Sequence, residues 1–526
     1  MTIGANDLAI WPAAVNAALL GADRTSLTLP APDGTLGAAC AGLTRDEPDP
    51  ATLLLRVAAA ATVYRRCGWR PARMADPAPE TCPPDPRPLC SPGAVGLLRR
   101  ILRGEHESLL GEWLALAARH GVRAPSDALR DLLDLGRREP GLRSLILAAG
   151  GTRATWLAGF NDEWSYAIAG ASLDALVATF ETGPGPARLA ALRQLRLVDA
   201  ERARAELEKS WAQESPADRA GFVAAFVHGL TPEDEPFLER ALDDRRKEVR
   251  QQAAALLTRL PTSALVGRMV ERATGLLSLG RTSMLKRTRI EVGLPAAADA
   301  VLVRDGVEAK PPAGIGERAW WLAQIIAAVP PATWTAAWSL APNAVLRAAD
   351  DNEWREPVVA GWLSATERHR DAAWAAALWE NERMARVDPR WGAPPPERVF
   401  TSVASAEQID TMLRSAIGAG RDVLRGSHPA LAAILEWPEQ WSDALAGAVA
   451  RRLKEYAGVD RVPLTAEFGL RALLERCAHA VPVPAVGAFL EGWPEHVDVW
   501  PTWAPTIDSL TSVLRFRSDL HRAFDE

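Results

Sequence analysis

Residues 231–277 read TPEDEPFLERALDDRRKEVRQQAAALLTRLPTSALVGRMVERATGLL, and this stretch decides the fold. Its apolar residues recur at helical spacing on three successive stripes. The stripes comprise Phe237, Leu238, Ala241 and Leu242, then Val249, Ala253, Leu256, Leu257 and Leu260, then Leu265, Met269, Ala273 and Leu276. Asp243 and Asp244 separate the first two stripes, and Pro261 opens the break before the third. We predict three short helices packed antiparallel, because connections this short force neighbouring helices together. Val249 and Leu256 should be buried, and Arg250 should lie on the side of the inter-helix turn.

The rest of the chain continues this helical pattern. With 526 residues it is long enough for two or three domains, or for one extended array whose units contact only their neighbours. Ala and Leu dominate, and no stretch alternates apolar and polar residues between hairpin turns. We therefore expect an all-α fold, an α-solenoid of stacked antiparallel helix pairs with almost no sheet. The net charge of -6 disfavours sequence-independent binding to nucleic acid or to an anionic membrane.

Breaks in the pattern divide the chain into four parts. They are N-terminal helices with a Pro-rich linker over 1–92, a helical array over 93–291, an interruption over 292–316, and a Trp-rich second helical block over 317–526. We place a domain boundary at the interruption, because Gly and Pro cluster there around a hydrophilic patch at Asp305 and Gly306.

The N-terminal part is predicted in more detail. A helix should run from Asp7 to Leu20, a polar connection should reach about residue 49, and a second helix should cover 51–67. Pro71 to Pro92 is too rich in proline for helix and is predicted to be an extended surface linker. The inward residues should be Leu8, Val15, Leu19 and Leu20 in the first helix, and Leu54, Leu55, Val57, Ala61 and Val63 in the second.

Several features indicate a cytoplasmic protein. The five cysteines are scattered and form no CxxC pair, which is typical of a reducing compartment. The N-terminus lacks the basic region of a signal peptide. Residues 319–346 carry no charge, but Pro330 and Pro331 cut them in half, so we predict a buried helical hairpin and no membrane span.

The sequence carries no familiar motif for catalysis, cofactor binding or metal binding. The sequence has no HExxH, no GxSxG and no paired CxxC. Cys477 and His479 are two residues apart and so point to different helix faces. Gly418 and Gly420 supply only GxG, without a preceding strand. We predict no catalytic residue, no cofactor and no metal ligand.

The 20 tryptophans are the least ordinary feature of the chain, and nearly half of them lie between residues 317 and 391. Packing between helices is the simpler interpretation, since each indole buries ~150 to 250 Å². The alternative is a partner-binding patch, because Trp is enriched at interface hot spots. We predict Trp354 and Trp362 as exposed members of such a patch, together with Arg355, because charged residues surround Trp354.

Several short sequence segments together indicate a family resemblance. They are Ala18, Leu19, Leu20, Gly21, Asp23 and Arg24; Trp156, Leu157, Asn161 and Trp164; Asp244, Arg245, Val249, Arg250, Leu257 and Pro261; Leu294 and Pro295; Gly316, Glu317, Arg318, Ala319, Trp320, Trp321 and Leu322; and Pro330 with Trp334. The chain resembles an uncharacterised bacterial family, a domain of unknown function, and the run from Asp244 to Leu257 resembles the second helix of a HEAT repeat. The resemblance implies HEAT-like helices and no catalytic residue.

Two functions follow as expectations. Members of this family are often encoded beside MoxR-type AAA ATPases, von Willebrand factor A domain proteins and SWIM zinc-finger proteins, so the resemblance implies a shared pathway. We expect a non-enzymatic scaffold or adaptor that binds proteins, an AAA ATPase and a von Willebrand A domain protein among them. The alternative is a nucleic-acid-binding or base-modifying HEAT-like enzyme, which needs an Arg-rich concave face with an acid and aromatic side chains at its centre.

Overall fold

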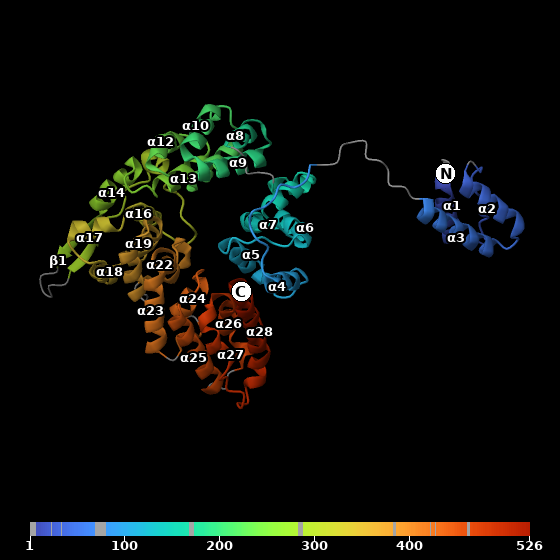
Figure 1. The fold of residues 1–526 in the computed structure, drawn as a ribbon. Coiled ribbons are helices and arrows are strands. Elements are labelled where there is room, and N and C mark those ends of the chain that lie inside the picture. Colours follow the sequence, from blue (N-terminus) through green and yellow to red (C-terminus); the bar gives the residue numbers. More distant parts are fainter. Residues whose placement is uncertain are drawn as a thin grey trace. The chain divides into compact units, whose positions relative to one another are not determined.

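The chain forms two compact units, residues 1–81 and 82–526, in the computed structural model (Figure 1). The structure describes residues 7–22, 24–32, 34–68, 80–167, 173–281, 288–381, 385–420, 422–426, 428–459 and 463–526. About 70% of the chain is helical, which confirms the all-α class. Within the described ranges the sheet is a single two-stranded hairpin.

The first unit is built from three helices. They are α1 (Asp7–Leu20), α2 (Thr35–Asp46) and α3 (Pro50–Gly68). Their shared core consists of Ile10, Ala14, Leu36, Cys40, Val57 and Ala61. The bounds of α1 and α3 agree with the sequence prediction, and each helix contacts the other two.

The predicted polar connection before residue 49 is wrong, because α2 occupies it. Leu36 and Cys40 are one helical turn apart on α2, and both are buried against the neighbouring helices. Gly37 and Gly42 lower the helix propensity of this segment. The apolar stripe of α2 has only two core positions, so the sequence pattern does not indicate a helix. Packing against α1 and α3 stabilises a helix that local propensity does not predict.

The predicted inward face of α1 is also wrong. Val15, Leu19 and Leu20 are exposed, and the burial of Leu8 lies outside the described residues. The buried side chains are instead Ile10, Ala14 and Ala17. A stripe chosen by side-chain size misses small residues, which let two helices approach closely.

On α3 the prediction is correct for Val57 and Ala61, which are buried, and wrong for Leu55 and Val63, which are exposed. Val57 and Ala61 are four residues apart and define the inward face. Leu55 lies two residues from Val57, on a different side of the helix.

The second unit contains the remaining elements. Its first helices are α4 (Pro92–Leu102), α5 (Leu110–Arg119), α6 (Leu129–Arg138), α7 (Arg143–Ala158), α8 (Leu173–Thr182), α9 (Gly185–Val198), α10 (Ala200–Ser210), α11 (Pro216–Ala224), α12 (Glu235–Ala241), α13 (Lys247–Leu257) and α14 (Ala264–Leu276), followed by the strands β1 (Leu277–Arg281) and β2 (Thr288–Val292). The later helices are α15 (Ala300–Arg304), α16 (Glu317–Ala327), α17 (Ala332–Trp338), α18 (Pro342–Asp350), α19 (Arg355–His369), α20 (Ala372–Glu380), α22 (Pro396–Val403), α23 (Ala406–Ala419), α24 (Pro429–Glu436), α25 (Asp443–Val459), α26 (Phe468–Ala480), α27 (Gly487–Leu490) and α28 (Trp500–Asp525). Short 3-10 helices join many of them, among them η4 (Asp162–Ala167), η6 (Pro232–Asp234) and η7 (Pro389–Trp391).

The second unit begins within the predicted Pro-rich linker. Residues 80–91 form no helix, as predicted, but they are not a free surface strap. Arg87 donates a hydrogen bond to the carbonyl oxygen of Ala148 on α7, and Asp85 accepts one from the amide of Thr152 at 3.2 Å. The unit therefore starts at Cys82 rather than at residue 93.

The central helices follow the sequence closely. In α13, Val249 and Leu256 are buried as predicted. The Arg250 guanidinium donates to the carbonyl oxygens of Asp244 and Arg245 at 2.8 and 3.0 Å, so it ties down the turn before its own helix. After α14 the chain turns directly into β1, which pairs antiparallel with β2 and places Leu277 opposite Val292.

The expected domain boundary at residues 292–316 is not a boundary between compact units. Leu302 and Val307 are buried in the same hydrophobic cluster as residues on both sides of this segment. Asp305 is buried as well, and it accepts hydrogen bonds from Arg268 and Arg272 of α14 at 2.7 Å each. Glycine and proline break the helix here, but Asp305 and the two apolar residues anchor the segment to the array.

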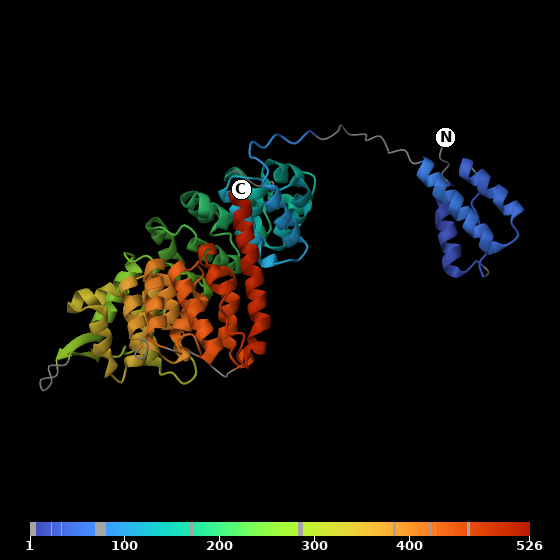
Figure 2. The ribbon, with the colours of Figure 1, turned by 60° about the horizontal axis from the view of Figure 1, so that its bottom comes forward.

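Helices that are not consecutive in the chain lie side by side in the later part of this unit (Figure 2). Each helix of the row α14, α16, α19, α22, α24, α26 and α28 contacts the next one. Pro330 and Pro331 separate α16 from α17, as predicted, and no described helix is long and apolar enough to cross a membrane. One hydrophobic cluster runs from Val177 to Leu514.

The last helix returns to the start of the unit. Phe516, Leu520 and Phe524 of α28 belong to a second hydrophobic cluster, together with buried residues of α4 to α7. The indole of Trp113 on α5 packs edge-on against Phe524, with ring centroids 5.4 Å apart. The C-terminal helix therefore joins both clusters of the second unit.

Candidate functional site

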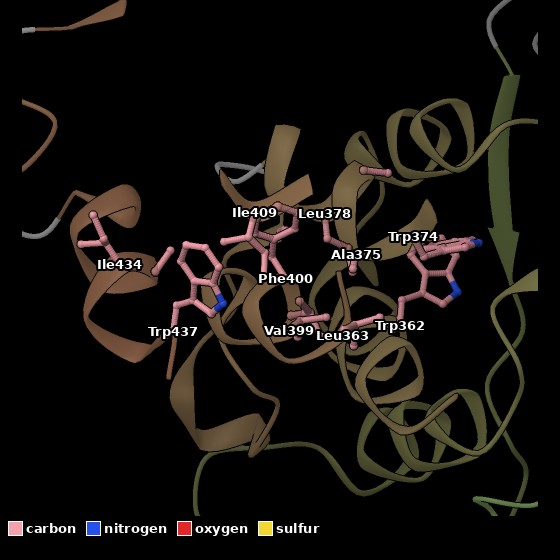
Figure 3. Packing of buried hydrophobic residues seen from close by; sticks show 14 of the residues in the cluster. Trp362, Leu363, Trp374, Ala375, Leu378, Val399, Phe400, Ile409, Ile434 and Trp437 are labelled. Carbon is pink, nitrogen blue, oxygen red and sulfur yellow. The ribbon is translucent and has the colours of Figure 1, made fainter. Parts of the chain in front are cut away.

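The predicted patch fails at Trp362, which is completely buried. Its ring packs against Trp374 at a centroid distance of 5.2 Å, within the core of α19 and α20 (Figure 3). Trp354 precedes the helix as its N-cap residue. Eight residues rotate a helix by about 80° beyond two full turns, so positions 354 and 362 do not share a face. The expectation that Trp362 is exposed is wrong for this reason.

Trp354 and Arg355 remain accessible at the N-terminal end of α19. The side chain of Trp354 is partly exposed, and its backbone amide donates to the Asn352 carboxamide oxygen at 2.8 Å. Arg355 donates to the carbonyl oxygen of Arg386 and lies 3.8 Å from the carboxylate of Asp350. These contacts hold the first turn of α19 in place and leave part of both side chains at the surface.

Two further tryptophans lie at the same end of the helix. Trp391, in η7, stacks on Trp320 of α16 with ring centroids 6.4 Å apart. Its indole N–H donates to the carboxylate of Glu356, the residue after Arg355, at 3.1 Å. Both rings are partly exposed. We call Trp320, Trp354, Arg355, Glu356 and Trp391 the α19 aromatic end.

Trp320 and Trp391 lie in the predicted Trp-rich block, but they were not among the tryptophans predicted to be exposed. They are 71 positions apart in the numbering, and only the packing of η7 onto α16 and α19 brings them together. The available signal was local, since Arg390 and Pro389 precede Trp391 and make its surroundings polar. The same reasoning had selected Trp354.

The remaining tryptophans of the block support the packing interpretation. Trp334 is completely buried, and its ring lies 5.1 Å from that of Trp338. Trp379 stacks on Phe400 at 5.1 Å. These rings pack between helices, and the α19 aromatic end is one of the places where part of the block's aromatic surface is exposed.

Two grooves of about 560 and 550 Å³ flank α25, and Gly447 and Arg451 line both. Gly447 contributes no side chain, and a Cβ there would meet nothing within 4 Å. The cations of the second groove are partly neutralised, since Arg414 pairs with Asp410 and Arg452 with Glu455, each at 2.7 Å. This charge balance gives the second groove little preference for a polyanion.

The described residues offer few groups arranged for catalysis. No group of three His, Cys, Asp or Glu residues there could hold a metal ion. Cys477 is completely buried, and burial raises the pKa of its thiol well above the usual value, so the reactive thiolate is disfavoured. Asp305 is the acid most closely surrounded by arginines, but the described residues that line the adjacent cavity include no aromatic side chain on which a base could stack.

Residues 13–524 match a family of unknown function, DUF5691. The chain belongs to this family. The match covers both units, from α1 to the last turn of α28, so the division at residue 82 lies within DUF5691. No curated protein and no solved structure matches the DUF5691 chain significantly. The description of the family assigns no activity.

Proposed function

We propose that this DUF5691 chain is a non-enzymatic, protein-binding scaffold whose helices form a HEAT-like α-solenoid. The row of helices from α14 to α28, each in contact with the next, supports the repeat architecture. Stacked helices of this kind present long surfaces to partners. The proposal concerns binding alone and assigns no catalytic residue.

The α19 aromatic end is the observation that carries the proposal. Three partly exposed indoles lie beside a cation, Arg355, and an anion, Glu356. Trp and Arg dominate binding energy at protein interfaces, because they combine a large apolar surface with hydrogen-bonding groups. Glu356 and the Trp320 ring hold Trp391 in one orientation, so little conformational entropy is lost when a partner covers it.

The proposed partners are a MoxR-type AAA ATPase and a von Willebrand A domain protein, as the family resemblance implies. We further propose that the complex forms in the cytoplasm. The structure shows no disulfide bond at Cys82, Cys90 or Cys477, which supports a reducing compartment.

The test measures direct binding between purified proteins. The full-length chain is immobilised, and the dissociation constant is measured for a purified MoxR-type ATPase and a purified von Willebrand A domain protein from the same source. Changing both Trp354 and Trp391 to Ala should weaken binding about 30-fold or more, since truncation of even one hot-spot side chain costs at least ~2 kcal/mol.

The matched control is Trp338→Ala. Trp338 is also partly exposed and lies in the same block, but on α17 rather than at the α19 aromatic end. Circular dichroism confirms that both variants are folded. Equal affinity of the double variant and the wild type would remove the α19 aromatic end as the contact, and no binding by either partner would remove the partners proposed.

A further inference from the structure

A cavity of about 210 Å³ lies between three helices of the second unit, away from the α19 aromatic end. Gln251, Ala255 and Thr258 of α13 form one wall, and Gln324 of α16 forms another. Asp305 and Arg368 complete it, the latter from the last turn of α19. This volume is smaller than the pockets of drug-sized ligands, which begin near ~300 Å³, and it suits an ion or one small group.

Arg368 is the unusual residue of this cavity. Its Nη1 donates to the carbonyl oxygen of Ala327, the last residue of α16, at 2.6 Å. No carboxylate of the described residues lies within ion-pair distance of its guanidinium. The neighbouring Glu367 is already paired with Arg398 at 3.2 Å. Burial lowers the pKa of Arg368, the charge of Glu367 opposes this, and the charge of Arg259 lowers the pKa further.

The acid across the cavity does not compensate Arg368. Asp305 accepts hydrogen bonds from Arg268, Arg272 and Arg304 at 2.7 to 3.3 Å. Glu239 and Asp243 complete that cluster through Arg268 and Arg304, so three guanidinium groups face three carboxylates. The charges of the cluster cancel, so Asp305 does not neutralise the positive charge of Arg368.

Capping of α16 explains only part of this arrangement. The C-terminal end of a helix carries about half a negative charge, which favours a guanidinium beside Ala327. His369 caps the next carbonyl, with its Nε2 3.3 Å from the oxygen of Ala328. One N–H of Arg368 serves this purpose, and a guanidinium has five. The other donors belong to a side chain that lines an open volume.

We propose that the cavity beside Arg368 binds a small oxyanion, the phosphate or carboxylate group of a small molecule. A guanidinium offers two parallel N–H donors that match both groups, and in a partly buried site such charge-assisted bonds are strong. Gln251, which lines the cavity, donates through Nε2 to Glu308 at 2.6 Å, and its carboxamide oxygen is an acceptor that suits the hydroxyl of hydrogen phosphate. This proposal does not rest on the scaffold function.

The test uses the full-length chain and inorganic phosphate, followed by isothermal titration calorimetry and by thermal unfolding. Sodium chloride at equal ionic strength is the reference, which removes general salt effects. The wild type should show saturable binding and a rise in Tm with phosphate concentration. Arg368→Gln should weaken binding about tenfold or more, since it removes the charged donor.

Arg259→Gln is the matched control, because Arg259 is an exposed neighbouring arginine that does not line the cavity. Ala255→Leu is a second variant that leaves Arg368 in place and fills the cavity from α13, and it should also abolish binding. Methyl phosphate and acetate replace phosphate in parallel titrations, to separate a free ion from the oxyanion group of a larger molecule. The proposal would be overturned if the wild type showed no saturable binding, or if either Arg368→Gln or Ala255→Leu bound phosphate with the affinity of the wild type.

Discussion

Arg517 on α28 donates hydrogen bonds of 2.8 and 3.0 Å to the carboxylate of Glu112 on α5, 405 residues earlier in the chain. The Arg517 side chain is completely buried, and its Nη1 also donates to the carbonyl oxygens of Ala478 and Val481. His521 lies 2.7 Å from the same carboxylate. This ion pair links the first helices of the second unit to its last helix.

Glu112→Gln should therefore destabilise the second unit by about 3 to 5 kcal/mol, because it leaves a buried guanidinium without its counter-charge. The urea midpoint at pH 7 measures the effect. The control is Glu105→Gln, which removes an exposed Arg–Glu pair in the same region, and its midpoint should stay close to that of the wild type. Equal midpoints for both variants would show that Glu112 contributes no more than a surface acid.

Gly361→Ala should destabilise the packing of α19 against α16. A Cβ at this position would lie 2.6 Å from the Cβ of Ile326 and 2.8 Å from the carbonyl oxygen of Ala323. Overpacking of this kind costs about 1 to 3 kcal/mol, more than the gain in helix propensity. Thermal unfolding provides the measurement.

Gly267→Ala on α14 is the matched control for this substitution. A Cβ there would meet nothing within 4 Å, so the variant should be more stable than the wild type by roughly 0.5 to 1 kcal/mol. The change in the free energy of unfolding should therefore have opposite signs in Gly361→Ala and Gly267→Ala. A stabilised Gly361→Ala variant would mean that the two helices are not in such close contact.

Leu256→Ala should cost about 2 to 5 kcal/mol, because Leu256 is buried in the core of α13 and its truncation leaves a cavity. Leu197→Ala on α9 is the control. Leu197 is 62% exposed, so this change should stay within about 0.5 kcal/mol of the wild type. Denaturant unfolding of both variants compares a buried and an exposed leucine, and similar losses would contradict the packing of α13.

His369 should make stability depend on pH. Burial lowers its pKa from 6.5 to about 4, and the charge of Arg368 lowers it as well, although the bond to the oxygen of Ala328 opposes this. The unfolded chain therefore binds a proton below pH 6.5 that the folded chain binds only near pH 4. The stability contributed by neutral His369 is present above pH 6.5 and is lost as the pH falls towards 4, by at most about 3 kcal/mol.

NMR titration of ¹³C-labelled histidine measures this pKa directly. His369→Gln keeps an N–H donor for the oxygen of Ala328 but cannot titrate, so it should flatten the pH dependence in that range. A histidine resonance for residue 369 that titrates near 6.5 would contradict the burial of the ring.

Much of the fold can be predicted from local pattern. The stripes between residues 231 and 277, the turn at Asp243 and Asp244, and the break at Pro330 all appear where the sequence places them. Helix period, caps and proline act over a few residues, so a single sequence contains the information needed.

The candidate site could be predicted only in part. Trp354 and Arg355 are accessible, but the choice of Trp362 as their neighbour was wrong, since Trp391 and Trp320 occupy that end of α19 instead. The charged residues around Trp354 do not determine which side of α19 is buried, so they could not predict the exposure of Trp362.

The amino-acid sequence by itself determined the helical class, the bounds of α1 and α3 and the absence of familiar catalytic motifs. The tertiary structure alone decided which small residues of α1 are buried, that Glu112 meets Arg517, and that no carboxylate of the described residues forms an ion pair with Arg368. Helix formation depends on residues three or four positions apart. Burial and charge pairing depend on segments hundreds of residues apart, and their free energies arise only when the folded chain brings those segments together.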